Sequence, residues 1–302
     1  MLLSRAVQEF LEAKENQYLS EQTLYTYRSI LSQFVQFCEE QGVVLLQDVI
    51  PDIPKFYISF CKKERKNNPV SINSKIKNLR SFFNFLVSEG FLEESPIKNL
   101  KFVKTDTRIE TFTEGQVKQI FAYLKKRKNQ EGGFHEHRDL AVVTFLLGTG
   151  ARAGEMCTLT WDDVDFNNSY LVLFGKSREA GAVPIVPRLK KELIEYQAFC
   201  ARKFIRLPVH VFTNQWGAPM TRSSVLQMFK RLNQYLGIRN VRFSPHTFRH
   251  TFAQDYIAKG GDLYSLQKML RHSRSSTTEK YMAMWGTALA SQNNKFNPLN
   301  HL

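Results

Sequence analysis

The C-terminal half of the chain carries six residues whose types and order could break and remake a phosphodiester bond. They are Arg152 in TGARAGE, Lys176 in FGKSREAGAVPI, His246 and Arg249 in SPHTFRH, His272 in MLRHS and Tyr281 in TTEKYM. Guanidinium groups suit the non-bridging oxygens of a phosphate, because they stay charged and donate hydrogen bonds in a fork. Together the six indicate phosphodiester chemistry without a metal ion.

Local sequence supports a functional role for the arginines. Arg152 follows the glycine-punctuated end of an apolar helix, where a charge is out of place unless it is used. Glu155, one turn later, could fix its guanidinium. His246 and Arg249 lie three residues apart in a predicted helix and therefore share a face, where an imidazole could orient or deprotonate a hydroxyl near neutral pH. Taken singly, each arginine is more often a solvated surface residue.

The lysine and the tyrosine gain meaning from the other residues. Lys176 lies at the tip of a predicted hairpin, from which a flexible ammonium could protonate a leaving 5′ oxygen. Tyr281 follows His272 by nine residues, and its phenol is a weak nucleophile until it is oriented and deprotonated. Alone, a lysine in a turn is usually solvated, and Tyr281 is one of 11 tyrosines.

A second interpretation of HTFRH is a metal-binding pair. His246 and His250 stand at i and i+4, but a catalytic zinc helix would carry an acid between them, and here Arg249 occupies that face. We therefore expect no metal site. The segment 135–137, HEH, is interpreted as a polar loop without chemistry of its own.

The elements that must hold these residues fall into two units. Residues 1–100 predict a helical bundle, residues 101–111 a polar linker, and residues 112–302 a mixed domain with a C-terminal tail. A β-hairpin is expected at 170–174 and 182–187, so the fold class is mainly α with a small antiparallel β-sheet. The predicted helices cover about 2–11, 20–42, 54–63 and 71–90 in the first unit and 114–127, 138–148, 188–203, 221–235, 246–258 and 262–270 in the second.

Positive charge is unevenly distributed along the chain. The net charge is +14, yet residues 1–100 hold twelve Lys or Arg and twelve Asp or Glu. Residues 201–250 carry nine Lys or Arg and no acid, which favours a nucleic-acid partner over a merely solvated face. A local basic patch also surrounds the third and fourth predicted helices. The residues expected to contact DNA are Lys62, Lys63, Lys75, Lys77, Arg80, Arg202, Arg222, Lys230 and Arg242.

Cysteine usage and hydropathy favour a cytoplasmic protein. The four cysteines are widely spaced and form no CxxC pair, which is typical of reduced core residues. The N-terminus is amphipathic and lacks the apolar core of a signal peptide. We find no apolar run long enough to span a membrane.

The motifs resemble those of the tyrosine recombinase family, which includes phage integrases and Xer proteins. TGARAGE is similar to the box of the first arginine, FGKSREAGAVPI to the lysine hairpin, and SPHTFRHTFA to the His-x-x-Arg box. MLRHSRSSTTEKYM resembles the last box, including the spacing from histidine to tyrosine. The resemblance covers about residues 5–285. It implies a SAM-like core-binding domain followed by a mixed α/β catalytic domain.

The resemblance also implies an activity. The chain would be a site-specific recombinase that needs neither ATP nor another cofactor. Tyr281 would form a 3′-phosphotyrosyl bond while the two arginines and His272 hold the phosphate, with His246 as general base and Lys176 as general acid. The partner would be a duplex DNA recombination site in the nucleoid. Family members act as a homo-tetramer or a paired recombinase, with the two domains clamped around the DNA.

Some alternatives stay open at this point. A catalytically silent DNA-binding protein and a monomeric type IB topoisomerase would share much of the sequence, although the intact catalytic set and the separate N-terminal domain disfavour them. The role could be integration, excision, inversion or chromosome-dimer resolution, and the lack of an additional N-terminal arm-binding domain leans toward the Xer-like type.

Two features depart from the shared motifs or lie beyond them. Arg271 replaces the glycine that the family usually has before the histidine of the last box. It is either without consequence at a helix end or an added phosphate contact. The tail after Tyr281 is expected to pack on a neighbouring protomer, with folding onto its own domain as the alternative.

Overall fold

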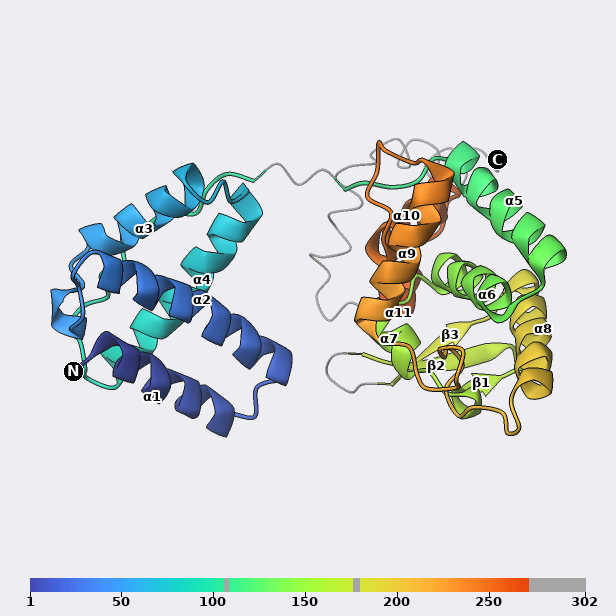
Figure 1. The fold of residues 1–302 in the computed structure, drawn as a ribbon, viewed down its shortest axis with the longest axis horizontal. Coiled ribbons are helices and arrows are strands. Elements are labelled where there is room, and N and C mark those ends of the chain that lie inside the picture. Colours follow the sequence, from blue (N-terminus) through green and yellow to red (C-terminus); the bar gives the residue numbers. More distant parts are fainter. Residues whose placement is uncertain (106–108, 176–179, 272–302) are drawn as a thin grey trace, which may run out of the picture. The chain divides into compact units, whose positions relative to one another are not determined.

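The computed structural model describes residues 1–105, 109–175 and 180–271. The chain divides into two compact units, Met1–Thr107 and Arg108–Leu302, and each is described here by itself (Figure 1). Within the described residues, no helix combines the length and the apolar character needed to cross a membrane. All four cysteines are buried free thiols, as predicted.

The first unit is the predicted helical bundle. Ser20 and Asn68 cap the second and fourth helices, and their side chains accept hydrogen bonds from the backbone amides of Thr23 and Ser71. Each helix turns its apolar stripe inward around aromatic rings such as Phe10. The helices are α1 (Leu3–Asn16), α2 (Glu21–Glu40), α3 (Asp52–Lys63) and α4 (Pro69–Ser88), with a 3-10 turn, η1 (Leu46–Asp48), between α2 and α3.

The second unit mixes helices with the small sheet. Its helices are α5 (Glu114–Glu131), α6 (Phe134–Thr149), α7 (Ala153–Thr158), α8 (Pro187–Lys203), α9 (Arg222–Leu236), α10 (Pro245–Ala258) and α11 (Leu263–Leu270), with a 3-10 turn, η2 (Trp161–Asp163), after α7. Its strands are β1 (Val164–Asp165), β2 (Tyr170–Phe174) and β3 (Ala180–Pro184). They form one antiparallel sheet in the order β1-β2-β3, so the predicted hairpin is confirmed and gains a short third strand.

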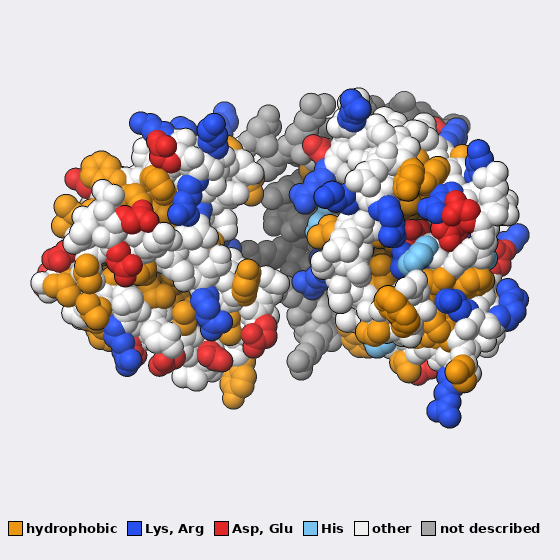
Figure 2. Space-filling view, in the orientation of Figure 1, with side chains coloured by type: hydrophobic (Ala, Val, Ile, Leu, Met, Phe, Trp, Pro, Cys, Tyr) orange, Lys and Arg blue, Asp and Glu red, His pale blue; other side chains and the backbone are white. Residues whose placement is uncertain are grey.

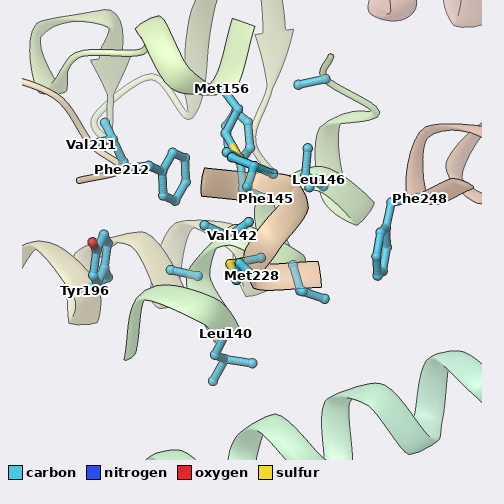
Figure 3. Packing of buried hydrophobic residues seen from close by; sticks show 14 of the residues in the cluster. Leu140, Val142, Phe145, Leu146, Met156, Tyr196, Val211, Phe212, Met228 and Phe248 are labelled. Carbon is cyan, nitrogen blue, oxygen red and sulfur yellow. The ribbon is translucent and has the colours of Figure 1, made fainter. Parts of the chain in front are cut away.

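Helix α6 is the centre of the second unit. From residue 140 to residue 146 it is buried on every side, and the helix packs against α5, α8 and α10 (Figure 1). Side chains from α6, such as Leu140, Val142 and Phe145, lie among rings and thioethers from α7, α8, α9 and α10 (Figure 3). The carboxyl end of α6 is therefore fixed by the core, and the segment that follows it starts from a rigid position.

The interpretation of residues 135–137 as a loop is wrong. Helix α6 begins at Phe134, with Gly133 as its N-cap, so these residues form its first turn. Glu136 accepts a hydrogen bond from Arg127 at 2.6 Å, and the ring of His137 stacks on Phe199 with 4.0 Å between centroids. The helix therefore begins one turn earlier than the apolar pattern predicts, because contacts with α5 and α8 stabilise its polar first turn.

Candidate active site

Arg249 lies deep in the second unit. Ser244 caps α10 and Pro245 starts it, which places Arg249 in the second turn with 4% of the residue exposed. Its Nη1 donates to the carbonyl of Gly150 and its Nη2 to the carbonyl of Leu270, both at 2.6 Å. Both carbonyls lie at helix C-termini, where the macrodipole stabilises a cation. The guanidinium is thus held between the ends of α6 and α11.

The turn after α6 requires glycine at position 150. Gly150 has φ 61°, in the left-handed region, and an added Cβ would lie 2.6 Å from Cδ1 of Phe252 and 2.8 Å from Cδ2 of Leu270. A side chain at this position would be strained and would also collide with the core. The tight turn brings the chain directly from α6 to Arg152, the N-cap of α7.

Arg152 and Glu155 form the contact that their spacing predicts. Arg152 Nη1 donates to Glu155 Oε1 at 2.7 Å, and the backbone amide of Arg152 donates to Oε2 at 2.8 Å. The side chain of Arg152 is 35% exposed, whereas that of Glu155 is 4% exposed. The buried carboxylate therefore holds both the backbone amide and one guanidinium nitrogen of a partly exposed arginine.

Glu155 has a second arginine partner, which sequence reasoning did not assign. Arg271 Nη2 donates to Glu155 Oε2 at 2.6 Å, and the Arg271 side chain is only 8% exposed. Burial alone would raise the pKa of the Glu155 carboxyl. The hydrogen bonds and charges of Arg271 and Arg152 outweigh burial and hold this pKa below its usual range. The carboxylate is therefore ionised between two guanidinium groups.

His246 lies in the first turn of α10, at the surface. The protein beneath the ring partly desolvates it, and the charges of Arg249, Arg242 and Arg152 act in the same direction, so the pKa of the imidazole is lowered. Near neutral pH the ring is neutral, which is the form that can accept a proton. The structure thus brings His246 into the electrostatic field of both arginines.

His250, the second histidine of α10, has a pKa that is lowered further. Burial, followed by the charges of His246 and Arg249, lowers the pKa of His250 to about 4. Among the described residues, no group of three His, Cys, Asp or Glu side chains is placed to hold a metal ion.

Three of the six predicted catalytic residues, Lys176, His272 and Tyr281, lie outside the described residues. Their neighbours are described. β2 ends at Phe174 and β3 begins at Ala180, so the two strands flank Lys176 in the chain. Arg271, the C-cap of α11, directly precedes His272.

Seven of the nine predicted DNA contacts are exposed basic residues. In the first unit, Lys62, Lys63 and Lys77 are exposed. In the second unit the exposed residues are Arg202, Arg222, Lys230 and Arg242. Lys and Arg side chains are spread over the visible face of the second unit (Figure 2).

The other two predicted contacts serve the first unit internally. Lys75 is 6% exposed, and its Nζ donates to Gln33 Oε1 at 2.7 Å and to the Tyr57 hydroxyl at 3.3 Å. Burial lowers the pKa of this ammonium. Arg80 donates to the carbonyl of Leu100 and stacks on Phe102, with 4.4 Å from Cζ to the ring centroid. We leave both out of the DNA surface.

Arg222 lies closer to the arginine pair than its sequence position suggests. An added Cβ on Gly154 would lie 2.6 Å from Arg222 Nη2 and 2.9 Å from Nε. The guanidinium therefore rests on the backbone of α7, two residues from Arg152. Nothing in the spacing of residues 154 and 222 could reveal this contact.

Comparisons with known proteins agree with this arrangement. The phage integrase family matches residues 110–285, and the phage integrase SAM-like domain matches residues 2–102. A protein of Bacillus pumilus (strain SAFR-032) named tyrosine recombinase XerC is 30% identical over 283 residues, which cover 90% of this chain and 88% of the relative.

Solved structures show the same fold at lower identity. The Tn1549 transposon integrase in complex with transposon right end DNA has a TM-score of 0.78 and 19% identity, covering 93% of this chain and 94% of that one. The XerH site-specific recombinase bound to a palindromic difH substrate has a TM-score of 0.75 and 18% identity, covering 93% and 82%.

Proposed function

The chain belongs to the phage integrase family and is a site-specific tyrosine recombinase, and from this premise we propose that it cuts and rejoins duplex DNA through a 3′-phosphotyrosyl bond on Tyr281. The observation that carries the proposal is the convergence of Arg152 and Arg249. Arg249 comes from α10 and donates to Gly150, in the turn after α6. Arg152 lies at the end of the same turn, as the N-cap of α7.

The phosphate would be held by both arginines. Arg249 is fixed by two backbone carbonyls and Arg152 by Glu155, so neither has to reorganise when negative charge builds on the non-bridging oxygens. Such preorganised donors stabilise the transition state more than the ground state. His272 would add a further hydrogen bond.

In the covalent steps, a phosphotyrosyl bond replaces the phosphodiester bond and retains its energy. The Tyr281 oxygen attacks phosphorus while its proton passes to His246, and the bond from phosphorus to the 5′ oxygen breaks. Lys176 donates a proton to that oxygen, which leaves as a 5′-hydroxyl. The 5′-hydroxyl of a partner strand then attacks the phosphotyrosine in the reverse sense, so the cycle needs no ATP.

DNA would be bound by the exposed basic residues of both units. Phosphate contacts would come from Lys62, Lys63 and Lys77 in the first unit and from Arg202, Arg222, Lys230 and Arg242 in the second. The residues near 101–111 would link the two units on the DNA. Four protomers would act on two DNA sites in the nucleoid, with the tail after Tyr281 packed on a neighbouring protomer.

Covalent trapping tests the proposal. A binding site is first selected by the protein from randomised duplex DNA, then synthesised with a nick that lets the short 5′-hydroxyl strand diffuse away. In EDTA, we expect an SDS-resistant adduct with the wild-type protein and none with Tyr281→Phe. Selection of a site without any adduct would instead support a silent DNA-binding protein. Relaxation of supercoiled DNA by a monomer without strand exchange would support a topoisomerase.

A further inference from the structure

Arg271 has a backbone conformation that suits glycine better than arginine. It is the C-cap of α11, with φ 53° and ψ 48°, in the left-handed region where helices commonly end in glycine. A residue with a Cβ is strained there. The contacts of its side chain offer a reason for this strain.

The side chain turns inward to a residue of another helix. Nη2 of Arg271 donates to Glu155 Oε2 at 2.6 Å, and Nη1 donates to the carbonyl of Met269, also at 2.6 Å. Glu155 accepts from Arg152 Nη1 through its other oxygen, at 2.7 Å. One buried carboxylate is therefore shared by a buried arginine and a partly exposed one, with side chains 8% and 35% exposed.

Two further contacts link Arg271 to the same site. Its backbone carbonyl accepts from Arg152 Nη2 at 3.4 Å. Its methylene stem lies on the backbone of β3, because an added Cβ on Gly181 would be 2.8 Å from both Cγ and Cδ of Arg271. Gly181 pairs with Leu173 of β2, in the hairpin whose connection contains Lys176.

We propose that Arg271 is a positioning residue, which anchors Glu155 and the β2–β3 hairpin so that Arg152 points at the scissile phosphate. This inference rests on the proposed function. Without Arg271, the Glu155 carboxylate would be held only by the backbone amide and the partly exposed side chain of Arg152. The buried guanidinium of Arg271 adds a charged donor to Oε2, so the carboxylate has less freedom to move and in turn limits the orientations of Arg152.

The alternative, a direct phosphate contact, fits the structure less well. Nη2 of Arg271 is paired with the Glu155 carboxylate, which compensates its charge, and the side chain is 8% exposed. The carbonyls of Gly150 and Leu270 that accept from Arg249 carry no net charge, so they leave the charge of that arginine to the phosphate. A phosphate contact would require the guanidinium to leave Glu155. The two possibilities differ in their effect on the salt dependence of DNA binding, since each phosphate contact adds to its slope.

The test compares Arg271→Gly, Arg271→Met and Arg271→Lys in single-turnover cleavage of the nicked duplex, with DNA affinity measured at several salt concentrations. We expect Gly and Met to slow cleavage at least tenfold while affinity changes less than twofold and its salt slope stays the same. Lysine keeps the charge and should recover part of the rate. Glycine relieves the backbone strain, so that variant tests the side chain without burdening the fold.

A double-mutant cycle shows whether Arg271 acts through Glu155. In the Glu155→Gln background, Arg271→Met should slow cleavage less than twofold further, because the group that it positions is already altered. Arg138→Met is the matched control. Its pair with Asp139 has the same 2.6 Å distance, with side chains 6% and 2% exposed. This pair lies near the amino end of α6, whereas Arg152 follows the carboxyl end. It should lower thermal stability and leave the cleavage rate unchanged.

Several results would overturn the inference. Wild-type cleavage rates in Arg271→Gly and Arg271→Met would do so while leaving the proposed function intact. Full additivity with Glu155→Gln would exclude action through the carboxylate. A weaker affinity with a shallower salt slope would make Arg271 a phosphate contact. If the wild-type protein forms no adduct, the proposed function fails as well.

Discussion

Arg249 donates to the carbonyl of Gly150, two residues before Arg152, at 2.6 Å. The arginine of α10 therefore helps to fix the turn that presents the other arginine. A second donation, to Leu270 at the end of α11, ties in the segment that leads to His272. Three motifs that are far apart in the sequence are thus joined at one guanidinium.

Arg249→Lys should reduce catalysis far more than DNA binding. A single ammonium cannot reproduce the fork that serves both carbonyls, so the turn after α6 and the phosphate would lose fixed donors. We expect single-turnover cleavage to fall about 100-fold, the range seen when one preorganised donor is lost, with affinity within a few-fold. A variant that cleaves at the wild-type rate would contradict the assigned role of the fork.

Gly150→Ala should destabilise the second unit by roughly 2–4 kcal/mol, because a collision with Phe252 and Leu270 adds to left-handed strain. Gly237→Ala is the matched control: Gly237 is also left-handed, with nothing within 4 Å of an added Cβ, and should cost only about 1 kcal/mol. The three tryptophans, Trp161, Trp216 and Trp285, all lie in the second unit, so tryptophan fluorescence in urea measures its unfolding. Equal losses would show that the Phe252 contact relaxes freely.

The protein should still cleave DNA at pH values below the ordinary pKa of histidine. The pKa of His246 is lowered from 6.5, so the neutral base persists on the acid side, and the acid limb of the rate profile should have its midpoint below pH 6.5. Arg242→Ala removes one of the charges that lower this pKa and should move the limb to higher pH. Arg239→Ala, a nearby exposed arginine, is the control. A limb that is unmoved by Arg242→Ala, measured at saturating DNA, would contradict this role of Arg242.

Lys75 and Lys77 should differ in DNA binding despite being two residues apart. Lys77 is exposed, whereas the Lys75 ammonium is bonded to Gln33 and Tyr57. Lys77→Met should weaken binding and reduce the slope of log affinity against log salt by about 0.9. Lys75→Met should leave the slope unchanged. Fluorescence anisotropy with the selected duplex measures both, and the reverse result would return Lys75 to the DNA surface.

Much of the fold follows from local pattern. The helices of the first unit and the β-hairpin are confirmed, because amphipathic spacing, N-caps such as Ser20, and turn residues all act within a few positions. The short helix α7 and the first turn of α6 were missed. They depend on tertiary contacts, such as that between Arg127 and Glu136, which no local pattern contains.

The candidate site shows the same division. The contact between Arg152 and Glu155 could be predicted because it spans three residues within a helical turn. The contact of Glu155 with Arg271 spans 116 residues and was not predicted. Lys75 was placed with the exposed lysines because charge alone does not reveal burial.

The most direct test of the central claim is to identify the amino acid that is linked to DNA. The adduct formed on the nicked duplex in EDTA is digested with nuclease and protease, and the peptide that retains a nucleotide is sequenced by mass spectrometry. We predict a 3′-phosphate ester on Tyr281. A nucleotide on any other residue, or no adduct on DNA that the protein binds, would contradict the account.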